Sequence, residues 1–158
     1  SSTSRQRTIN YIEKGVEEGA TLLIDGRKAQ FDNDGKGFFL GPTIFDDVEP
    51  SMAIALDEIF GPVLSVMRMD SLEAAIRTID NIPYGNMASI FTSSGKAARE
   101  FSSRVRAGNV GVNIGVAAPM AFFHFGGMKE SFYGDLHGQA SDAINFFTEE
   151  KIVVERWF

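Results

Sequence analysis

Residues 63–113 read VLSVMRMDSLEAAIRTIDNIPYGNMASIFTSSGKAAREFSSRVRAGNVGVN, and this stretch decides the fold. Short apolar runs bounded by turn residues are expected to be strands at residues 63–69, 88–92 and 109–113. Between them, apolar residues recur at helical spacing over 72–79 and 97–105. The β-α-β-α-β order predicts an α/β fold with a parallel sheet and right-handed crossovers. Because the strands are apolar on both faces, the sheet is expected to be the middle of three layers.

Capping residues support these helix boundaries. Asp70 or Ser71 is expected to cap the first helix, and Ser93 or Ser94 the second. Gly108 lies just beyond the end of the second helix, where glycine commonly ends a helix.

The residues before this run predict one longer helix and several short strands. Thr3 with Gln6 forms a possible capping box, so a helix is expected over about residues 4–18, ended by Gly19. Three short apolar runs are expected to be strands: residues 22–24, 38–40 and 43–45. Residues 33–37 are rich in Asn, Asp and Gly and predict a turn.

The residues after the run lose their periodicity. Residues 115–138 are rich in Gly and Phe, and a connection of this length in a compact domain usually lines a site. A short helix is expected over about residues 139–146, followed by a terminal strand at residues 151–157.

Composition bounds the function classes. The length of 158 residues suffices for one domain with a core. The net charge of −6 argues against nucleic acid as a partner, because neutralising phosphates needs clustered Lys and Arg. The longest apolar stretch, 115–123, is too short to cross a membrane, and the first residues contain no apolar segment of a secretory signal. The chain has no cysteine, which excludes disulfides, thiolate metal sites and cysteine nucleophiles within it and fits a cytoplasmic protein.

The first candidate site is the sequence DEIFGP at residues 57–62, called the motif loop below. One interpretation is a surface Glu58 and a core Phe60 before a strand. The functional interpretation is that the Glu58 carboxylate accepts hydrogen bonds from a ribose diol, as acidic residues do in dinucleotide sites, with the Phe60 ring beside a nicotinamide.

The second candidate is residues 122–131, FFHFGGMKES. The spacing of a phosphate-binding P-loop is not met, nor is Gly-x-Gly-x-x-Gly. The segment is either a tight turn beside a phenylalanine cluster or an apolar throat for a small substrate, with glycines that permit close backbone approach. His124 and His137 have no carboxylate at metal-site spacing, so both are interpreted as structural and no metal site is predicted. A serine-hydrolase elbow is also missing from the sequence.

Together these segments resemble the C-terminal third of an aldehyde dehydrogenase. The motif loop resembles that superfamily's nicotinamide-ribose motif, and residues 81–85 and 107–113 resemble stretches that follow it. Most of the superfamily has Pro-Phe-Gly-Gly-x-Lys-x-Ser-Gly where this chain has HFGGMKESF at 124–132. Two further segments, 113–120 and 129–135, look like the methylmalonate-semialdehyde dehydrogenase branch, which uses coenzyme A to release an acyl-CoA.

The resemblance implies roles for three residues. Glu58 would bind the nicotinamide ribose of NAD, Phe60 would contact the nicotinamide ring, and Phe125 would line the aldehyde tunnel. Residues 1–148 would form part of the catalytic domain, and residues 149–158 an oligomerisation strand of a homo-oligomer. No catalytic residue is assigned within this chain.

The reaction implied by the family begins with a cysteine thiolate that attacks the aldehyde, followed by hydride transfer to NAD and release of the acyl group to coenzyme A. Because this chain has no cysteine, it is expected to be a fragment that is inactive alone. Its expected substrates are methylmalonate and malonate semialdehyde. The alternatives are part of a hydrolytic aldehyde dehydrogenase for another small aldehyde, or a non-catalytic assembly module, which the Phe-rich last third would suit.

Overall fold

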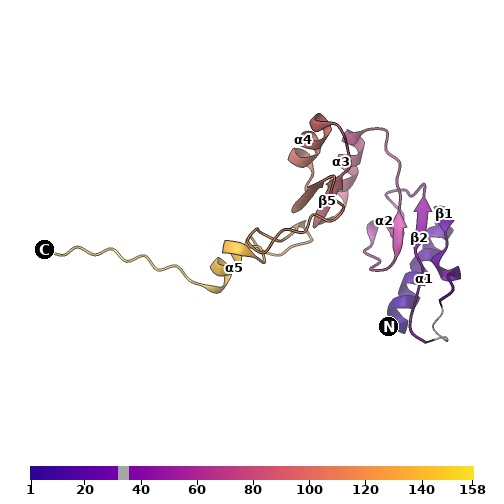
Figure 1. The fold of residues 1–158 in the computed structure, drawn as a ribbon, viewed down its shortest axis with the longest axis horizontal. Helices are drawn as coiled ribbons and strands as arrows, with labels where there is room; N and C mark the ends of the chain where they lie inside the picture. The colour runs from indigo at the N-terminus through magenta and orange to yellow at the C-terminus, as the bar shows by residue number, and fades with distance from the viewer. Residues whose placement is uncertain (32–35) are drawn as a thin grey trace. The chain divides into compact units, whose positions relative to one another are not determined.

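The structure is a computed structural model, and it describes residues 1–31 and 36–158. These residues form two compact units, Ser1–Asp70 and Ser71–Phe158 (Figure 1). Each unit has its own hydrophobic cluster. The turn expected over residues 33–37 lies mostly outside the described residues. Gly37, at its end, has φ +90°.

The first unit begins with the helix α1, Ser2–Glu17. Its N-cap is Ser1, whose side-chain oxygen accepts a hydrogen bond from the backbone N–H of Ser4 at 3.2 Å. The helix therefore starts two residues earlier than the predicted capping box at Thr3 required, because Ser1 satisfies the free N–H groups first. Gly19 has φ +97°, a left-handed conformation that glycine adopts at little cost, so its predicted role in ending the helix is confirmed.

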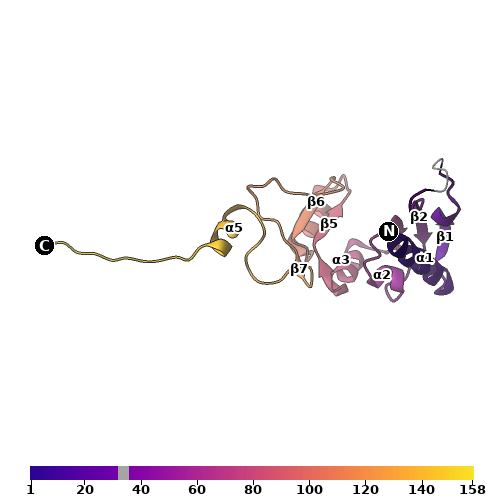
Figure 2. The same cartoon turned by 90° about the horizontal axis from the view of Figure 1, so that it is seen from below.

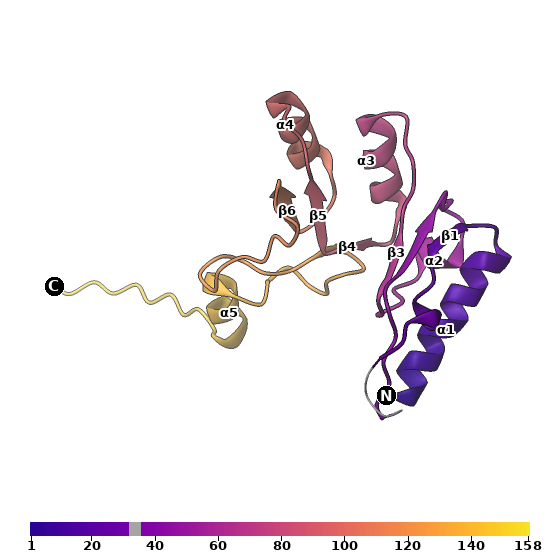
Figure 3. The ribbon, with the colours of Figure 1, turned by 45° about the vertical axis from the view of Figure 1, so that its right-hand side comes forward.

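A three-stranded sheet lies beside α1 in this unit, as Figure 3 shows. Strand β1 (Thr21–Ile24) pairs antiparallel with β2 (Thr43–Asp46), and β2 pairs parallel with β3 (Val63–Ser65). A short 3₁₀ helix, η1 (Gly26–Lys28), follows β1, and α2 (Ala53–Leu56) lies between β2 and β3. The strand expected at residues 38–40 is not formed.

The core of the first unit joins α1 to the sheet. Ile12 of α1 and Phe45 of β2 are both 0% exposed and belong to one buried cluster. The other buried members are Ala20, Val48, Met52, Ile54 and Ile59. Ile59 comes from the motif loop, so packing of this core fixes the middle of the loop.

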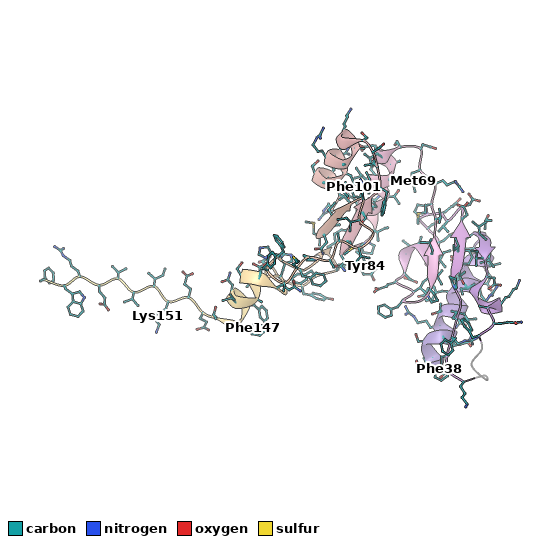
Figure 4. All side chains as sticks on the ribbon, in the orientation of Figure 1. Phe38, Met69, Tyr84, Phe101, Phe147 and Lys151 are labelled. Carbon is teal, nitrogen blue, oxygen red and sulfur yellow. The ribbon has the colours of Figure 1, made fainter. Side chains whose placement is uncertain are left out.

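The second unit contains the helices and strands of the predicted α/β run. Helix α3 (Leu72–Asn81) is capped by Ser71 and helix α4 (Gly95–Arg104) by Ser94, so one of the two residues expected at each cap is confirmed. Strands β5 (Met87–Ile90) and β6 (Asn109–Val112) lie side by side as a parallel pair (Figure 2). The core centres on Phe101 of α4, labelled in Figure 4, together with Ile76, Val105 and Ala107.

Two shorter elements complete the second unit. Strand β4 (Tyr84–Gly85) pairs antiparallel with β7 (Met128–Lys129), which returns the chain to the end of α3. Helix α5 (Ala140–Phe147) confirms the short helix expected near residues 139–146.

An α/β fold with parallel pairing is confirmed, but not as one sheet in this chain. Strand β3 pairs with β2, and in the described residues no ladder joins β3 to β5 or β6. The prediction of a single β-α-β-α-β sheet is not confirmed, because β3 belongs to the sheet of the first unit and β5 and β6 form a separate pair in the second. The strand predicted over residues 63–69 also ends at Ser65.

The terminal strand expected at residues 151–157 is not formed within this chain by itself. Residues 148–158 form no helix or strand, and all of their side chains are exposed. A strand is defined by its ladder to a neighbour, and no neighbour pairs with this tail among the described residues. Within the same residues, no helix is both long and apolar enough to cross a membrane.

Candidate functional site

The motif loop, residues 57–62, begins where α2 ends. The backbone N–H of Asp57 donates to the carbonyl oxygen of Ala53 at 3.0 Å and closes the helix. At the other end, the carbonyl oxygen of Pro62 accepts from the N–H of Thr43 at 2.8 Å, which starts the pairing of β2 with β3. Both ends of the loop are therefore fixed by backbone hydrogen bonds.

Helix α1 holds the middle of the loop through its side chains. Arg7 donates from Nη2 to the carbonyl oxygen of Glu58 at 2.7 Å and from Nη1 to that of Ile59 at 3.0 Å. The hydroxyl of Tyr11 donates to Oδ2 of Asp57 at 3.0 Å. These residues stand one turn apart on one face of the helix, so the loop lies along that face.

Glycine is needed where the loop crosses the helix. A β-carbon on Gly61 would lie 2.6 Å from Oγ1 of Thr8, too close for a side chain to fit without movement. Thr8 is 3% exposed and its hydroxyl donates back to the carbonyl oxygen of Ser4 at 3.0 Å, so it has little freedom to yield. The Gly61-Pro62 corner thus rests directly on α1.

Glu58 and Phe60 point away from the core while Ile59 between them is buried. Glu58 is exposed and Phe60 is 81% exposed. Phe60 has φ +57°, a left-handed conformation that is uncommon for a residue with a bulky side chain. The interpretation of Phe60 as a core residue is therefore wrong, and the loop presents a carboxylate and a flat ring to solvent.

The Glu58 carboxylate has no counter-ion within the described part of the chain. Its backbone carbonyl, not its carboxylate, accepts the hydrogen bond from Arg7. The guanidinium of Arg7 lies 5.3 Å from the centre of the Tyr11 ring, a cation–π distance. The carboxylate of Glu58 is consequently left to accept hydrogen bonds from a ligand, as ribose hydroxyls would offer.

The structure brings Glu58 and Phe60 together on one loop and places Phe125 in the second unit. Phe125 is 39% exposed, and its carbonyl oxygen accepts from the N–H of Gly138 at 2.9 Å. The next residue, Gly126, is held by the side-chain amide of Asn109, which donates to its carbonyl oxygen at 3.2 Å. Residues 125–127, called the glycine bend below, are thus fixed from both sides.

The two histidines do have a carboxylate partner, contrary to the expectation from their spacing. Nδ1 of His124 lies 2.8 Å and Nδ1 of His137 3.2 Å from the same oxygen of Asp142, in the first turn of α5. That oxygen also accepts the backbone N–H of His137 at 3.0 Å, which lowers the pKa of Asp142 below its usual value. Among the described residues, no three His, Asp or Glu side chains are placed to bind a metal ion.

Lys129 fixes the segment after the glycine bend to the end of α3, a role that the sequence patterns did not indicate. Its ammonium donates to the carbonyl oxygens of Ile79 at 2.9 Å and Ile82 at 2.6 Å, at the C-terminal end of α3. Desolvation lowers its pKa. Ser131 adds a second tie, because its hydroxyl accepts from the N–H of Gly85 at 2.9 Å. A lysine just past two glycines was the only available signal, and it does not reveal a partner some fifty residues away.

The aldehyde dehydrogenase family model matches residues 1–153 of this chain. The chain belongs to the aldehyde dehydrogenase family. A malonate-semialdehyde dehydrogenase of Geobacillus kaustophilus is 51% identical over 153 residues, which are 97% of this chain and 31% of that protein. One of Bacillus pumilus is 50% identical over the same shares of the two chains.

Solved structures of aldehyde dehydrogenases share the fold. The methylmalonate-semialdehyde dehydrogenase of Oceanimonas doudoroffii superposes with a TM-score of 0.96 at 43% identity, covering 99% of this chain and 32% of that one. An aldehyde dehydrogenase of Mycobacterium tuberculosis complexed with NAD⁺ gives a TM-score of 0.85 at 36% identity, covering 96% of this chain and 30% of that one. The resemblance predicted from the motifs is confirmed. This aldehyde dehydrogenase chain spans 31% of the length of its curated relatives.

Proposed function

We propose that this chain is the C-terminal part of an NAD-dependent dehydrogenase of malonate or methylmalonate semialdehyde. The observation that carries the proposal is the motif loop, where Glu58 and Phe60 are exposed while the backbone beneath them is bonded to α1. Side chains of this kind on a fixed backbone can position a ligand without reorganisation of the protein. The names of the relatives supply the substrate class.

The residues present fit the nicotinamide half of NAD. The Glu58 carboxylate has free acceptor sites for the two hydroxyls of a ribose, and the Phe60 ring offers a flat apolar face of the size of a nicotinamide. When bound, NAD supplies the acceptor for the hydride of the aldehyde. Glu58 and Phe60 would orient the nucleotide, and neither would take part in proton or hydride transfer.

Phe125 is proposed to line the path of the aldehyde. Its ring stands on the glycine bend, which is anchored by Gly138 and Asn109. A partly exposed ring on a fixed backbone suits an apolar wall beside a small substrate.

The groups needed for the complete reaction lie outside this chain. It contains no cysteine to serve as the nucleophile, so the chain is inactive alone in this proposal. Release of the acyl group to coenzyme A is proposed from the likeness of residues 129–135 to the methylmalonate-semialdehyde branch. Residues 1–148 would belong to the three-layered catalytic domain, and the rest of that domain would come from the rest of the protein.

Residues 149–158 are proposed to pair with a sheet of another subunit in a homo-oligomer. The tail is exposed along its whole length and contains the apolar run Ile152, Val153 and Val154. An extended apolar segment with unpaired backbone groups is suited to adding a strand to a neighbouring sheet. A cytoplasmic location remains part of the proposal, in keeping with the lack of cysteine.

The test is Glu58→Gln in the complete dehydrogenase that carries this segment, with Glu49→Gln as the matched control because Glu49 is also an exposed glutamate of the first unit. Loss of a charged hydrogen bond is expected to raise KM for NAD, or lower kcat, by about 10-fold or more. Tm should stay within about 2 °C of the parent. Unchanged NAD kinetics with a lowered Tm would overturn the assignment of Glu58.

Product analysis in the same assay separates the two enzyme hypotheses. Formation of acyl-CoA from malonate or methylmalonate semialdehyde supports the acylating dehydrogenase. Formation of free acid at a rate independent of coenzyme A would support the hydrolytic alternative. A complete protein with no dehydrogenase activity on small aldehydes would favour the assembly module.

A further inference from the structure

We infer that Arg7 of α1 is a positioning residue for the cofactor site, acting through the backbone of Glu58 and Ile59. The inference rests on the proposed role of Glu58 and Phe60 in binding the nicotinamide half of NAD. Arg7 itself would not touch the nucleotide.

The two hydrogen bonds of Arg7 fix consecutive peptide planes. The carbonyl oxygen of Glu58, bonded at 2.7 Å, belongs to the peptide between residues 58 and 59, and that of Ile59, bonded at 3.0 Å, to the next peptide. Because peptide units are planar, holding both oxygens sets the backbone torsions of Ile59. The direction in which Glu58 leaves the loop and the start of the left-handed turn at Phe60 are set at the same time.

Arginine suits this task better than lysine. Its planar guanidinium presents separate nitrogens at a fixed spacing, so Nη1 and Nη2 each reach one of two adjacent carbonyl oxygens. An ammonium donates from a single nitrogen that rotates freely, so it would hold the same two oxygens in a less fixed geometry. Hydrogen bonds from a charged donor are also stronger than neutral ones, which favours a rigid loop.

The guanidinium of Arg7 has no competing ion pair within the part of the chain that the structure describes, and it is available to bind the motif loop. In the described residues, no carboxylate lies within ion-pair distance of Arg7. The Tyr11 ring beneath the guanidinium, at 5.3 Å, limits its movement, and the Tyr11 hydroxyl holds Asp57 at the start of the loop. Arg7 and Tyr11 therefore hold the motif loop together, both from one face of α1.

Arg5 provides a matched control on the same helix. Its Nε donates to the carbonyl oxygen of Phe39 at 2.9 Å, so it also joins α1 to a backbone carbonyl of a distant segment. That segment is not the motif loop. Removal of the Arg5 guanidinium should thus reproduce the loss of a helix-to-backbone contact without a change in the cofactor site.

The experiment compares Arg7→Met, Arg7→Lys and Arg5→Met in the complete dehydrogenase. Arg7→Met is expected to raise KM for NAD about 5- to 20-fold while KM for the aldehyde changes less than about 2-fold. Arg7→Lys should lie between the parent and Arg7→Met, and Arg5→Met should match the parent. Equal NAD kinetics in Arg7→Met and Arg5→Met would overturn the inference. If Arg7→Met does not fold, Arg7→Lys, which keeps the charge and the stem, decides by the same comparison.

A double variant tests whether Arg7 acts through Glu58. In Arg7→Met combined with Glu58→Gln, the increase in KM for NAD should be smaller than the product of the two single increases. The reason is that Glu58→Gln neutralises a carboxylate that Arg7→Met has already displaced. Full multiplication of the effects would contradict a role through Glu58. If Glu58→Gln alone leaves NAD kinetics unchanged, the proposed function fails. If Glu58→Gln has its effect and Arg7→Met has none, only the inference fails.

Discussion

The carbonyl oxygen of Gly126 occupies the space in which a β-carbon of Gly108 would stand. Gly108 precedes β6, and Gly126 belongs to the glycine bend that carries Phe125. The two backbones touch without a side chain between them, and the α-carbon of Gly127 would lie 2.8 Å from the same β-carbon. This contact, rather than any unusual torsion of Gly108, explains why glycine is required there.

Gly108→Ala is expected to be strongly destabilising. A methyl group would overlap backbone atoms, which cannot rotate away as a side chain does, so the free energy of unfolding should fall by about 2–4 kcal/mol. Gly115→Ala is the control, because nothing lies within 4 Å of a β-carbon at that position. Equilibrium unfolding in urea measures both variants. A change below about 0.5 kcal/mol in Gly108→Ala would show that the bend moves freely away from β6.

Asp142 should make the glycine bend sensitive to acid. The pKa of its carboxyl is lowered, chiefly by the backbone N–H of His137, so folding is stabilised by the ionised form. This stabilisation is complete above the ordinary carboxyl pKa of about 3.9 and is lost as the pH falls through the lowered folded-state pKa. Amide exchange of His137 and Gly138 is therefore expected to accelerate, relative to the rest of the second unit, below about pH 4.

The control for this pH dependence is a variant of the carboxyl group itself. Asp142→Asn should show fast amide exchange at His137 and Gly138 even at neutral pH, with little further change on acidification. Asp135→Asn, at an exposed position of the same segment, should behave like the parent. Identical exchange profiles for the parent and Asp142→Asn would contradict the role of this carboxylate.

The terminal tail is predicted to govern assembly of the complete dehydrogenase. Val153→Pro removes one backbone N–H and prevents regular ladder pairing, so the oligomer should dissociate to smaller species. Val153→Thr keeps the β-branched shape and should preserve assembly. Sedimentation velocity distinguishes the two outcomes. An unchanged sedimentation coefficient for Val153→Pro would remove the tail from the interface.

The sequence by itself determined the local elements and the family. Capping serines at 71 and 94 and the spacing of apolar residues located α3 and α4, because such signals act within one or two turns of a helix. The motif loop and residues 124–132 indicated the aldehyde dehydrogenase family, because these short runs are distinctive as written.

Only the tertiary structure decided which segments meet. Strand β3 pairs with β2, Arg7 reaches carbonyl oxygens 51 and 52 residues away, and Asp142 joins two histidines that seemed unpartnered in the sequence. Phe60 is likewise a residue type that is usually buried, yet its side chain is exposed and its backbone is left-handed. Contacts of this kind depend on how distant backbones approach one another, and neither periodicity nor capping carries that information.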